Sequence, residues 1–520
     1  MRTLRHATLI TILFAATGCL VGPKNVTLDT SAPESLAGRL AITDAAAEMA
    51  AVKPATAWWE RFNDPKLNEL IGRALKANQD LEVAKERIRA ARAGARGVKS
   101  ALVPTVDSNS SVSKSQSSLR ARAEEQDQEF FGADRYSRNY SSSIDAAYEI
   151  DIWGKNRQGI EGAKQGILAA EAAYRATVLS LVAEVAATYF EARGAEETRL
   201  LIAEEVKNRE EFLEIIVRRE KSGLTSPLDT RRQEVEIANV RAQLPAAETR
   251  VVRANYRLAT LLGENPQTFD MESAKLAGLP VLPLVPEGLP ADLMRQRPDV
   301  LRAEAVARGA AADIGVALGD MYPSLTASAS AGYSSAFFGD FMDDLSDKWT
   351  LASALRLPLF DGGRRYAELE ARRAQFREAV AAYRQTVLLA LEEINTSLVA
   401  ASKSRESRSA RYAALESARE ANRIAREQYR AGSIALVDLL DSQRTELQTR
   451  QLVIDADQQT VTDVVSLYKA FGGGWDVTAV DPVALPERST GRRIAENIPL
   501  WAAGLDDPFD ADESGKSGNP

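Results

Sequence analysis

The side chains that could perform covalent or metal chemistry are scarce in this 520-residue chain. It has one histidine, His6, and one cysteine, Cys19, and both lie within the first nineteen residues. Zinc sites, Ser-His-Asp triads, Cys-His dyads and disulfide frameworks all need more of these residue types than the rest of the chain contains. The sequence therefore predicts that the protein is not an enzyme and holds neither a metal nor a cofactor. Catalysis by carboxylates or lysines alone is an alternative that no motif supports.

The composition and charge narrow the class of protein further. The formal net charge of −8 argues against non-specific binding to nucleic acid, which needs a clustered basic surface. With 45% hydrophobic and 27% charged but only 6% aromatic residues, the composition is typical of long helices and coiled coils. We therefore predict a mainly helical protein without a nucleic-acid partner.

The N-terminus has the layout of a secretory signal. Arg2 and Arg5 precede an apolar run over residues 7–16, and small residues lead from there to Cys19. A run of about ten apolar residues is too short for a spanning helix but suits a signal peptide, which we predict at residues 1–18. Because no uninterrupted run of about 18 apolar residues follows, we predict no transmembrane helix in the rest of the chain.

The residues around Cys19 resemble the lipobox of bacterial lipoproteins, in which the cysteine is acylated and becomes the first residue. Leu20 follows it where an aspartate would favour retention in the inner membrane, so the outer membrane is the predicted location. Several acyl chains would hold the N-terminus firmly in a leaflet, because each buried CH₂ contributes about 0.8 kcal/mol. The resemblance implies lipid attachment at Cys19. The alternative is an ordinary cleaved signal peptide beside an incidental thiol.

The second half of the chain repeats the first. The sequence AAYR at residues 172–175 recurs at 381–384, an offset of 209 (381 − 172). Earlier in each half the offset is 219 (323 − 104), so the first half carries ten extra residues (219 − 209). We therefore predict an internally duplicated fold. The offset of 209 also maps Gly154 to Gly363, Gly223 to Gly432, Asp229 to Asp438 and Gly263 to Gly472.

Each half contains alternating segments that we predict to be membrane strands. Apolar and polar side chains alternate over residues 140–153 and 349–359, and the partner segments are 105–119 and 324–337. A tilted strand of about 9 to 11 residues crosses a bilayer, so each segment is long enough. Since four strands cannot close a barrel, a dimer would supply eight and a trimer twelve. The alternative is two soluble hairpins packed on the helices.

A very long helical stretch follows each pair of strands. It runs from Lys155 to about Ser222 in the first half and from Arg364 to about Ala431 in the second, without internal proline. At about 1.5 Å per residue, each stretch would span roughly 100 Å. Apolar side chains at seven-residue intervals predict coiled-coil packing, although a coiled coil alone would not explain the strands. These side chains are Ile160, Ile167, Tyr174 and Leu181, and in the second half Leu369, Phe376 and Tyr383.

Glycine marks the point where each long helix must reverse. After Gly223, Ser226 is predicted to cap a returning helix that begins with Pro227 and is interrupted at Pro245. Asp229 would support the dipole of this helix in its first turn. We therefore assign Asp229 to helix capping.

The returning helix after Gly432 carries a charged face. Asp438 and Asp441 are three residues apart, and Arg444 continues the same face. One interpretation is structural, with a first-turn aspartate serving the helix dipole and Asp441 forming a surface pair with Arg444. The other, which we favour for Asp441, is that rotational symmetry in a channel gathers its copies into a ring at the mouth.

Several motifs occur in a characteristic order over residues 19–475. They are WWERF at 58–62, NQDL at 78–81, RPDV at 297–300, YPSL at 322–325, LPLFDGGR at 357–364 and GGGW at 472–475. Together they resemble the TolC-type outer-membrane factor family, in its lipoprotein branch that serves resistance-nodulation-division (RND) pumps.

The resemblance implies a homotrimer that is lipid-anchored in the bacterial outer membrane and extends into the periplasm, with a twelve-stranded barrel continued by a helical tunnel. Its partners would be outer-membrane lipid, a periplasmic adaptor protein and an inner-membrane RND-type pump. The adaptor would contact the turns at Gly223, Ser226, Gly432 and Ser433. In the family, the periplasmic gate combines a constricting apolar residue with an aspartate that is partnered by a nearby tyrosine or arginine. The matching positions here are Val437, Asp441, Tyr429 and Arg444, with Asp438 beside them.

The predicted fold class is mainly α with a small β part, and the predicted function is a passive exit duct for small molecules in a tripartite efflux pump. The alternatives are an outer-membrane conduit for type I protein secretion or metal efflux and, in another class, a structural periplasmic coiled-coil lipoprotein.

The chain after the signal peptide is predicted to divide into five segments. They are a lipid-anchored extended linker (19–57), a first repeat (58–263, with strands at about 105–153 and a helical hairpin at 155–263), an inter-repeat segment (264–292), a second repeat (293–475, with strands at about 324–360 and a helical hairpin at 363–472) and an acidic, partly disordered tail (476–520).

Overall fold

The computed structural model describes residues 21–23, 57–116, 136–271 and 297–472. The chain divides into two units, Met1–Asp476 and Val477–Pro520, and all described residues belong to the first. The predicted signal peptide, Cys19 and the predicted tail lie outside the described residues, as do most of the predicted linker and inter-repeat segment.

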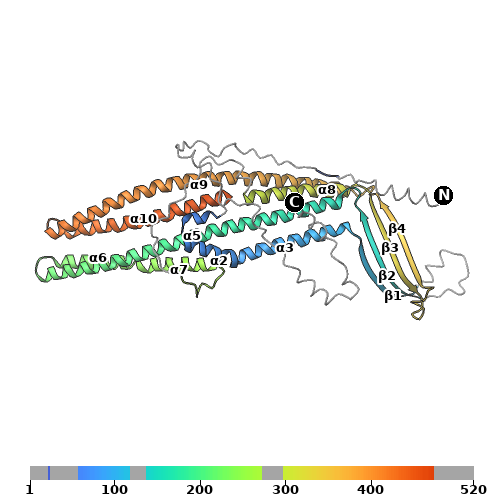
Figure 1. The fold of residues 1–520 in the computed structure, drawn as a ribbon, viewed down its shortest axis with the longest axis horizontal. Helices are drawn as coiled ribbons and strands as arrows, with labels where there is room; N and C mark the ends of the chain where they lie inside the picture. The colour runs from blue at the N-terminus through green and yellow to red at the C-terminus, as the bar shows by residue number, and fades with distance from the viewer. Residues whose placement is uncertain (1–20, 24–56, 117–135, 272–296, 473–520) are drawn as a thin grey trace, which may run out of the picture. The chain divides into compact units, whose positions relative to one another are not determined.

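Helices and strands follow each other in the same order twice, and Figure 1 shows the long helices α5 and α9 running from the sheet to two turns at the other end. The predicted mainly helical, internally duplicated fold with four strands is confirmed. The first copy comprises η2 (Trp58–Phe62), α2 (Pro65–Ala77), α3 (Gln79–Lys99), η3 (Ser100–Leu102), β1 (Thr105–Gln116), β2 (Tyr136–Ile150), α5 (Lys155–Lys221), α6 (Pro227–Arg241) and α7 (Leu244–Leu261). The second comprises α8 (Pro298–Gly319), β3 (Ser324–Ser335), β4 (Asp347–Arg356), α9 (Arg364–Ala431) and α10 (Leu436–Ala470).

Paired glycines show that the duplication extends to the backbone conformation. Each glycine pair at the 209-residue offset has a positive φ, a region that glycine enters at little cost. Because these glycines lie next to helix ends, the backbone turns in the same way at three corresponding helix boundaries of the two copies. The φ values are 76° and 86° at Gly154 and Gly363, 72° and 73° at Gly223 and Gly432, and 71° and 77° at Gly263 and Gly472.

Gly263 has a second constraint besides its positive φ, because it packs closely against Ala77. A Cβ atom there would overlap the carbonyl oxygen of Ala77, whereas a Cβ at Gly223 would meet nothing within 4 Å, although φ is positive at both. We expect Gly263→Ala to lower the free energy of unfolding by about 3 kcal/mol and Gly223→Ala by about 1 kcal/mol. Urea unfolding of the purified variants would measure both. Equal losses would show that the contact with Ala77 relaxes without cost.

The four strands form one antiparallel sheet in the order β1-β2-β3-β4. Successive rows alternate between its two faces, because neighbouring side chains of a strand point to opposite sides. One row contains Ser108, Ile144, Ala331 and Trp349, and the next contains Asp107, Asp145, Ser330 and Thr350. Ile144 is 61% exposed and Trp349 77% exposed, so the described chain does not cover the apolar face. The predicted alternation is confirmed.

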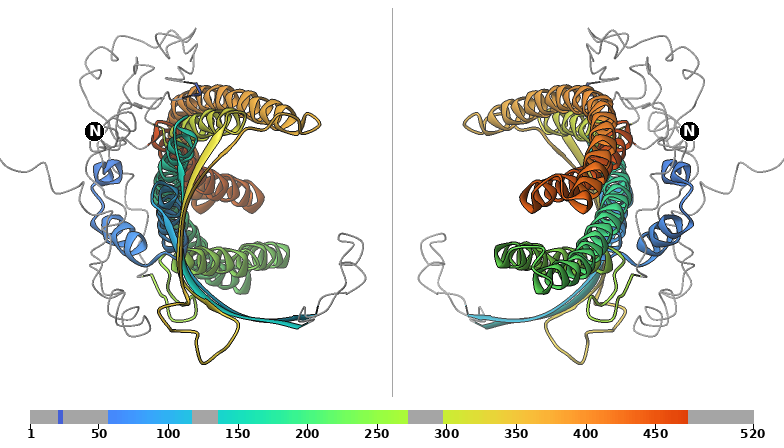
Figure 2. Two further views of the ribbon diagram at one scale, coloured as in Figure 1. Left: turned by 90° about the vertical axis from the view of Figure 1, so that its right-hand side faces the viewer. Right: turned by 90° about the vertical axis from the view of Figure 1, so that its left-hand side faces the viewer.

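The sheet is curved, and the helices distribute unevenly about it. Figure 2 shows that the ends of α6 and α10 lie toward its concave side, whereas α2, in blue, lies on the opposite side. On the polar face Asp145 accepts hydrogen bonds from Asn109 (2.7 Å) and Ser330 (2.5 Å). The two faces of the sheet therefore differ: one carries hydrogen-bonded polar side chains, and the other carries exposed apolar side chains.

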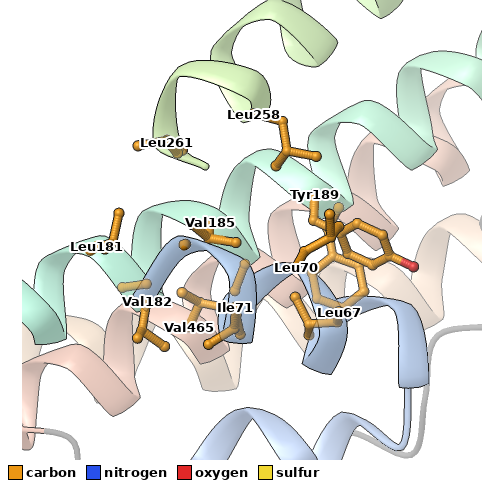
Figure 3. Packing of buried hydrophobic residues seen from close by; sticks show 14 of the residues in the cluster. Leu67, Leu70, Ile71, Leu181, Val182, Val185, Tyr189, Leu258, Leu261 and Val465 are labelled. Atoms are coloured by element: carbon orange, nitrogen blue, oxygen red, sulfur yellow. The ribbon is translucent and has the colours of Figure 1, made fainter. Parts of the chain in front are cut away.

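The largest apolar core lies about halfway along the helices. Figure 3 shows Leu67 and Ile71 of α2 packed against Val182 of α5, with Leu258 of α7 and Val465 of α10 completing the cluster. The ring of Trp58 stacks on that of Tyr468 at a centroid distance of 5.1 Å. The WWERF segment therefore packs against helices of both copies.

One 18-residue window of α5 has a mean hydropathy of 1.3 and could cross a membrane by length and composition. This measure does not decide the prediction that no such helix follows the signal peptide, because it rests on length and composition alone. However, α5 packs against α2, α3, α6, α7, α8 and α10. A core helix of a helical body satisfies the same measure, because it is apolar where it meets its neighbours.

Candidate gate at the helical turns

Both predicted turns are present and capped as the sequence indicates. Ser226 Oγ accepts a hydrogen bond from the Leu228 N–H (3.2 Å), and Pro227 begins α6. At the second turn Gly432 ends α9, and Ser433 Oγ donates to the carbonyl of Gln428 (3.0 Å). Glycine, serine and proline thus reverse the chain within a few residues at each turn.

An apolar cluster joins the second turn to α5. Ile216 packs with Leu436, Leu439 and Leu440, and Tyr429 lies among them at 8% exposure. Its ring meets Phe212 edge-on at 5.8 Å, and the Arg219 guanidinium lies 5.4 Å from its centroid. In the described part of the chain no hydrogen bond joins Tyr429 to Asp441. The structure therefore places Tyr429 in the packing beneath the turn, away from its predicted carboxylate partner.

Asp438 and Asp441 have different surroundings. Asp438 Oδ2 accepts a hydrogen bond from the Ala435 N–H (3.2 Å), which caps the start of α10. The Asp441 side chain is 76% exposed and lies 3.6 Å from Arg444. Val437, one turn earlier on the same face, is 49% exposed. Of the predicted gate residues, Val437, Asp441 and Arg444 thus share one open face of α10.

Behind this face lies a row of paired charged side chains that the sequence patterns did not predict. Arg444 Nη2 contacts Glu236 Oε1 at 2.6 Å, Glu236 Oε2 lies 3.3 Å from Arg209, and Arg209 Nε contacts Glu205 at 2.9 Å. The Arg209 side chain is only 2% exposed. The i,i+4 spacing of Glu205 and Arg209 was a local signal, whereas the Glu236–Arg444 pair is formed only by the tertiary structure.

Positive and negative side chains alternate along this group. The hydrogen bond and charge of Glu236 raise the pKa of the Arg444 guanidinium above its ordinary value. Gln233 Nε2 donates to the backbone carbonyl of Arg209 at 2.9 Å and so holds α6 against α5. We call Glu205, Arg209, Glu236 and Arg444 the charge relay. It joins α5 and α6 of the first copy to α10 of the second, one helical turn from Asp441.

One family model matches this chain twice. The model described as "Outer membrane efflux protein" covers residues 70–264 and again residues 289–473. The chain belongs to the outer membrane efflux protein family. The predicted resemblance to TolC-type outer-membrane factors is thereby confirmed, and the two matches correspond to the two copies of the fold.

Named relatives and solved structures agree with this membership. The pyoverdine export outer membrane protein OpmQ of Pseudomonas putida is 30% identical over 82% of this chain and 90% of its own length. The probable efflux pump outer membrane protein TtgC of Pseudomonas putida is 30% identical over 80% of this chain and 85% of its own length. The outer-membrane channel OprN is similar with a TM-score of 0.78 and 30% identity, over 88% of this chain and all of that one.

This efflux protein is therefore an outer-membrane channel component of an efflux pump, a conduit and not an enzyme. Family membership decides against the structural coiled-coil lipoprotein. Among the described residues, no cluster of three or more His, Cys, Asp or Glu side chains could hold a metal ion.

Proposed function

We propose that this efflux channel acts as a lipid-anchored homotrimer whose sheets join into one twelve-stranded barrel. The four-stranded sheet carries this proposal, because β1 and β4 are its edge strands and its apolar face is exposed. Unpaired strand edges are not tolerated in lipid, so the sheet must pair with other copies. Four strands from each of three copies leave room for a lumen lined by the polar face.

We infer that the helical turns meet a periplasmic adaptor protein and, through it, an inner-membrane RND-type pump. Two apolar side chains at the first turn are open, Leu224 at 70% and Leu228 at 54% exposure. Leu224 directly follows Gly223, and Leu228 lies two residues after Ser226. Gly432 and Ser433 form the second turn. Exposed apolar side chains at the end of a helical hairpin are suited to packing against helices of a partner.

The proposed gate is the open face of α10. In a trimer, three copies of Val437 and Asp441 would approach the axis, where the carboxylates favour cations and the valines narrow the passage. The charge relay would hold α10 against α5 and α6 in this arrangement. Adaptor and pump would open the duct by moving α9 and α10 away from the axis.

The proposed cargo is small organic molecules. The names of relatives refer to pyoverdine, antibiotics and toluene, and this range supports a duct with little selectivity of its own. A conduit for secreted protein or for metal ions remains the alternative within the channel class.

Single-channel recording in planar bilayers tests the gate. We expect purified protein to form stable pores, and Asp441→Ala to raise conductance roughly twofold and reduce cation selectivity, because the carboxylate ring is lost. Asp463→Ala on the same helix is the control and should leave both unchanged. Stable pores with unaltered conductance in Asp441→Ala would refute the gate, and the absence of pores from trimeric protein would refute the channel.

A further inference from the structure

A short stretch of the N-terminus lies at the boundary between the sheet and the helices. It comprises Val21, Gly22 and Pro23. The Val21 N–H donates a hydrogen bond to the carbonyl oxygen of Trp153 (3.1 Å), in the loop between β2 and α5. The chain is therefore attached to the body of the protein at Val21, two residues after Cys19.

Glycine is required at position 22 for two reasons. Its φ of +139° lies in a region that side chains rarely adopt, and a Cβ would come within 2.9 Å of both Gln158 Nε2 and Gly315 Cα. Gly315 leaves space in the same way, because a Cβ there would lie 2.7 Å from Gln158 Cγ. The side chain of Gln158, only 5% exposed, thus lies between two glycines. This close fit leaves no room for a side chain at position 22.

The surroundings of this fit are held by both copies of the repeat. Trp153 Nε1 donates to the carbonyl of Pro323 (2.8 Å), and its ring stacks on Tyr322 at 4.9 Å. Trp153 and Gln158 belong to the first copy, whereas Gly315 belongs to α8 of the second. We call Trp153, Gln158 and Gly315 the N-terminal seat. The N-terminal seat therefore lies where the two copies contact each other, and residues of both copies hold it in place.

Chain length shows what the seat accomplishes. Cys19 is two residues from Val21, so their Cα atoms are separated by at most about 7 Å. Trp153 follows the end of β2 at Ile150 by only three residues. The seat therefore keeps Cys19 close to the level where the strands end.

We propose that the N-terminal seat fixes the acyl chains of Cys19 at the boundary of the sheet and the helices, and that Gly22 determines this fit. The proposal rests on the acylation of Cys19 within the proposed function. The anchor and the strands then enter the same leaflet at one depth. In a trimer, three seated anchors raise the effective concentration of the strand edges for one another and so speed closure of the barrel.

Two pairs of variants of the full chain test the seat. Gly22→Val blocks the fit, and Pro23→Val places the same side chain at the next, exposed position. The second pair inserts eight glycine and serine residues either between Leu20 and Val21, which frees the anchor from the seat, or between Pro23 and Lys24, which does not. We expect roughly fivefold slower formation of protease-resistant trimers in pulse-labelled cells for Gly22→Val and for the first insertion, and less than about twofold slowing for the two controls.

Mass spectrometry of the N-terminal peptide and photo-crosslinking complete the experiment. A photoreactive residue at Pro23 should crosslink to the peptide around Trp153 and Gln158 in the wild type, and Gly22→Val should reduce this product. Assembly of Gly22→Val and of the first insertion at the wild-type rate would overturn the proposal, as would the absence of the crosslink with Cys19 acylated. An unmodified Cys19 in the wild type would instead refute the lipid anchor of the proposed function, and with it the purpose of the seat.

Discussion

Glu236→Ala is expected to open the channel and to lower the free energy of unfolding by about 3–5 kcal/mol, because it leaves the buried Arg209 without one of its two carboxylate partners. Arg444 loses its shortest contact in the same variant, so α10 is no longer joined to α6. Single-channel conductance should rise, since helices that are less constrained splay more readily. Urea unfolding and planar-bilayer recording of one preparation would measure both effects.

The control for Glu236→Ala is Glu234→Ala on the same helix. Glu234 pairs with Arg231 at the surface, with the two side chains 42% and 77% exposed, so its loss should cost at most about 1 kcal/mol. Glu236→Gln separates charge from shape, because the amide can still contact Arg209 and Arg444 but carries no charge. An unchanged conductance in Glu236→Ala would show that the charge relay stabilises the fold without restraining the gate.

The two copies of the repeat differ where the gate is proposed. At the 209-residue offset, the capping residue Asp438 corresponds to Asp229, so an aspartate lies in the first turn of the returning helix in both copies. Asp441 instead corresponds to Arg232 (441 − 209) and Arg444 to Val235 (444 − 209). A role in helix geometry would be needed equally in both copies, whereas a ring at the axis needs the carboxylate in one. The divergence therefore supports separate roles for Asp438 and Asp441.

Local patterns in the sequence predicted most of the fold. Strand alternation, the heptad positions and the capping residues Ser226 and Gly432 depend on neighbours within about seven positions, and the structure places them as the patterns indicate. The duplication could be predicted because it compares the chain with itself. A search for uninterrupted apolar runs does not register the apolar window of α5, since interrupted apolar stretches also occur where a helix packs on several others.

The contacts that position the candidate gate and the seat could not be predicted in this way. Glu236 and Arg444 are 208 residues apart (444 − 236), and no spacing rule relates a returning helix of one copy to that of the other. Gly22 likewise appears as an ordinary loop glycine until Gln158 and Gly315 are placed beside it. Tyr429 shows the opposite case, because the family resemblance implied that it partners Asp441, whereas its burial makes it part of the packing.

Arg297→Ala is expected to destabilise the second copy by about 3–5 kcal/mol, because the side chain is 8% exposed and joins three helices. Its guanidinium contacts Asp299 at 2.8 Å and Glu393 of α9 at 2.6 Å, and Nη1 donates to the carbonyl of Ala470 at the end of α10. Arg308→Ala, on the same helix, removes a pair in which the arginine is 50% exposed and should cost at most about 1 kcal/mol.

The pH dependence of Arg297→Ala distinguishes lost charge pairing from lost packing. Burial alone would raise the pKa of the Asp299 carboxyl, but the hydrogen bond and charge of Arg297 outweigh it and lower the pKa below its ordinary value. A depressed pKa contributes stability above the unfolded value of about 3.9, and this contribution is lost as the pH falls through the folded value. The difference in unfolding free energy between wild type and Arg297→Ala should therefore be constant at neutral pH and shrink below about pH 4. A difference that stays constant down to pH 2 would assign the whole effect to packing and to the bond with Ala470.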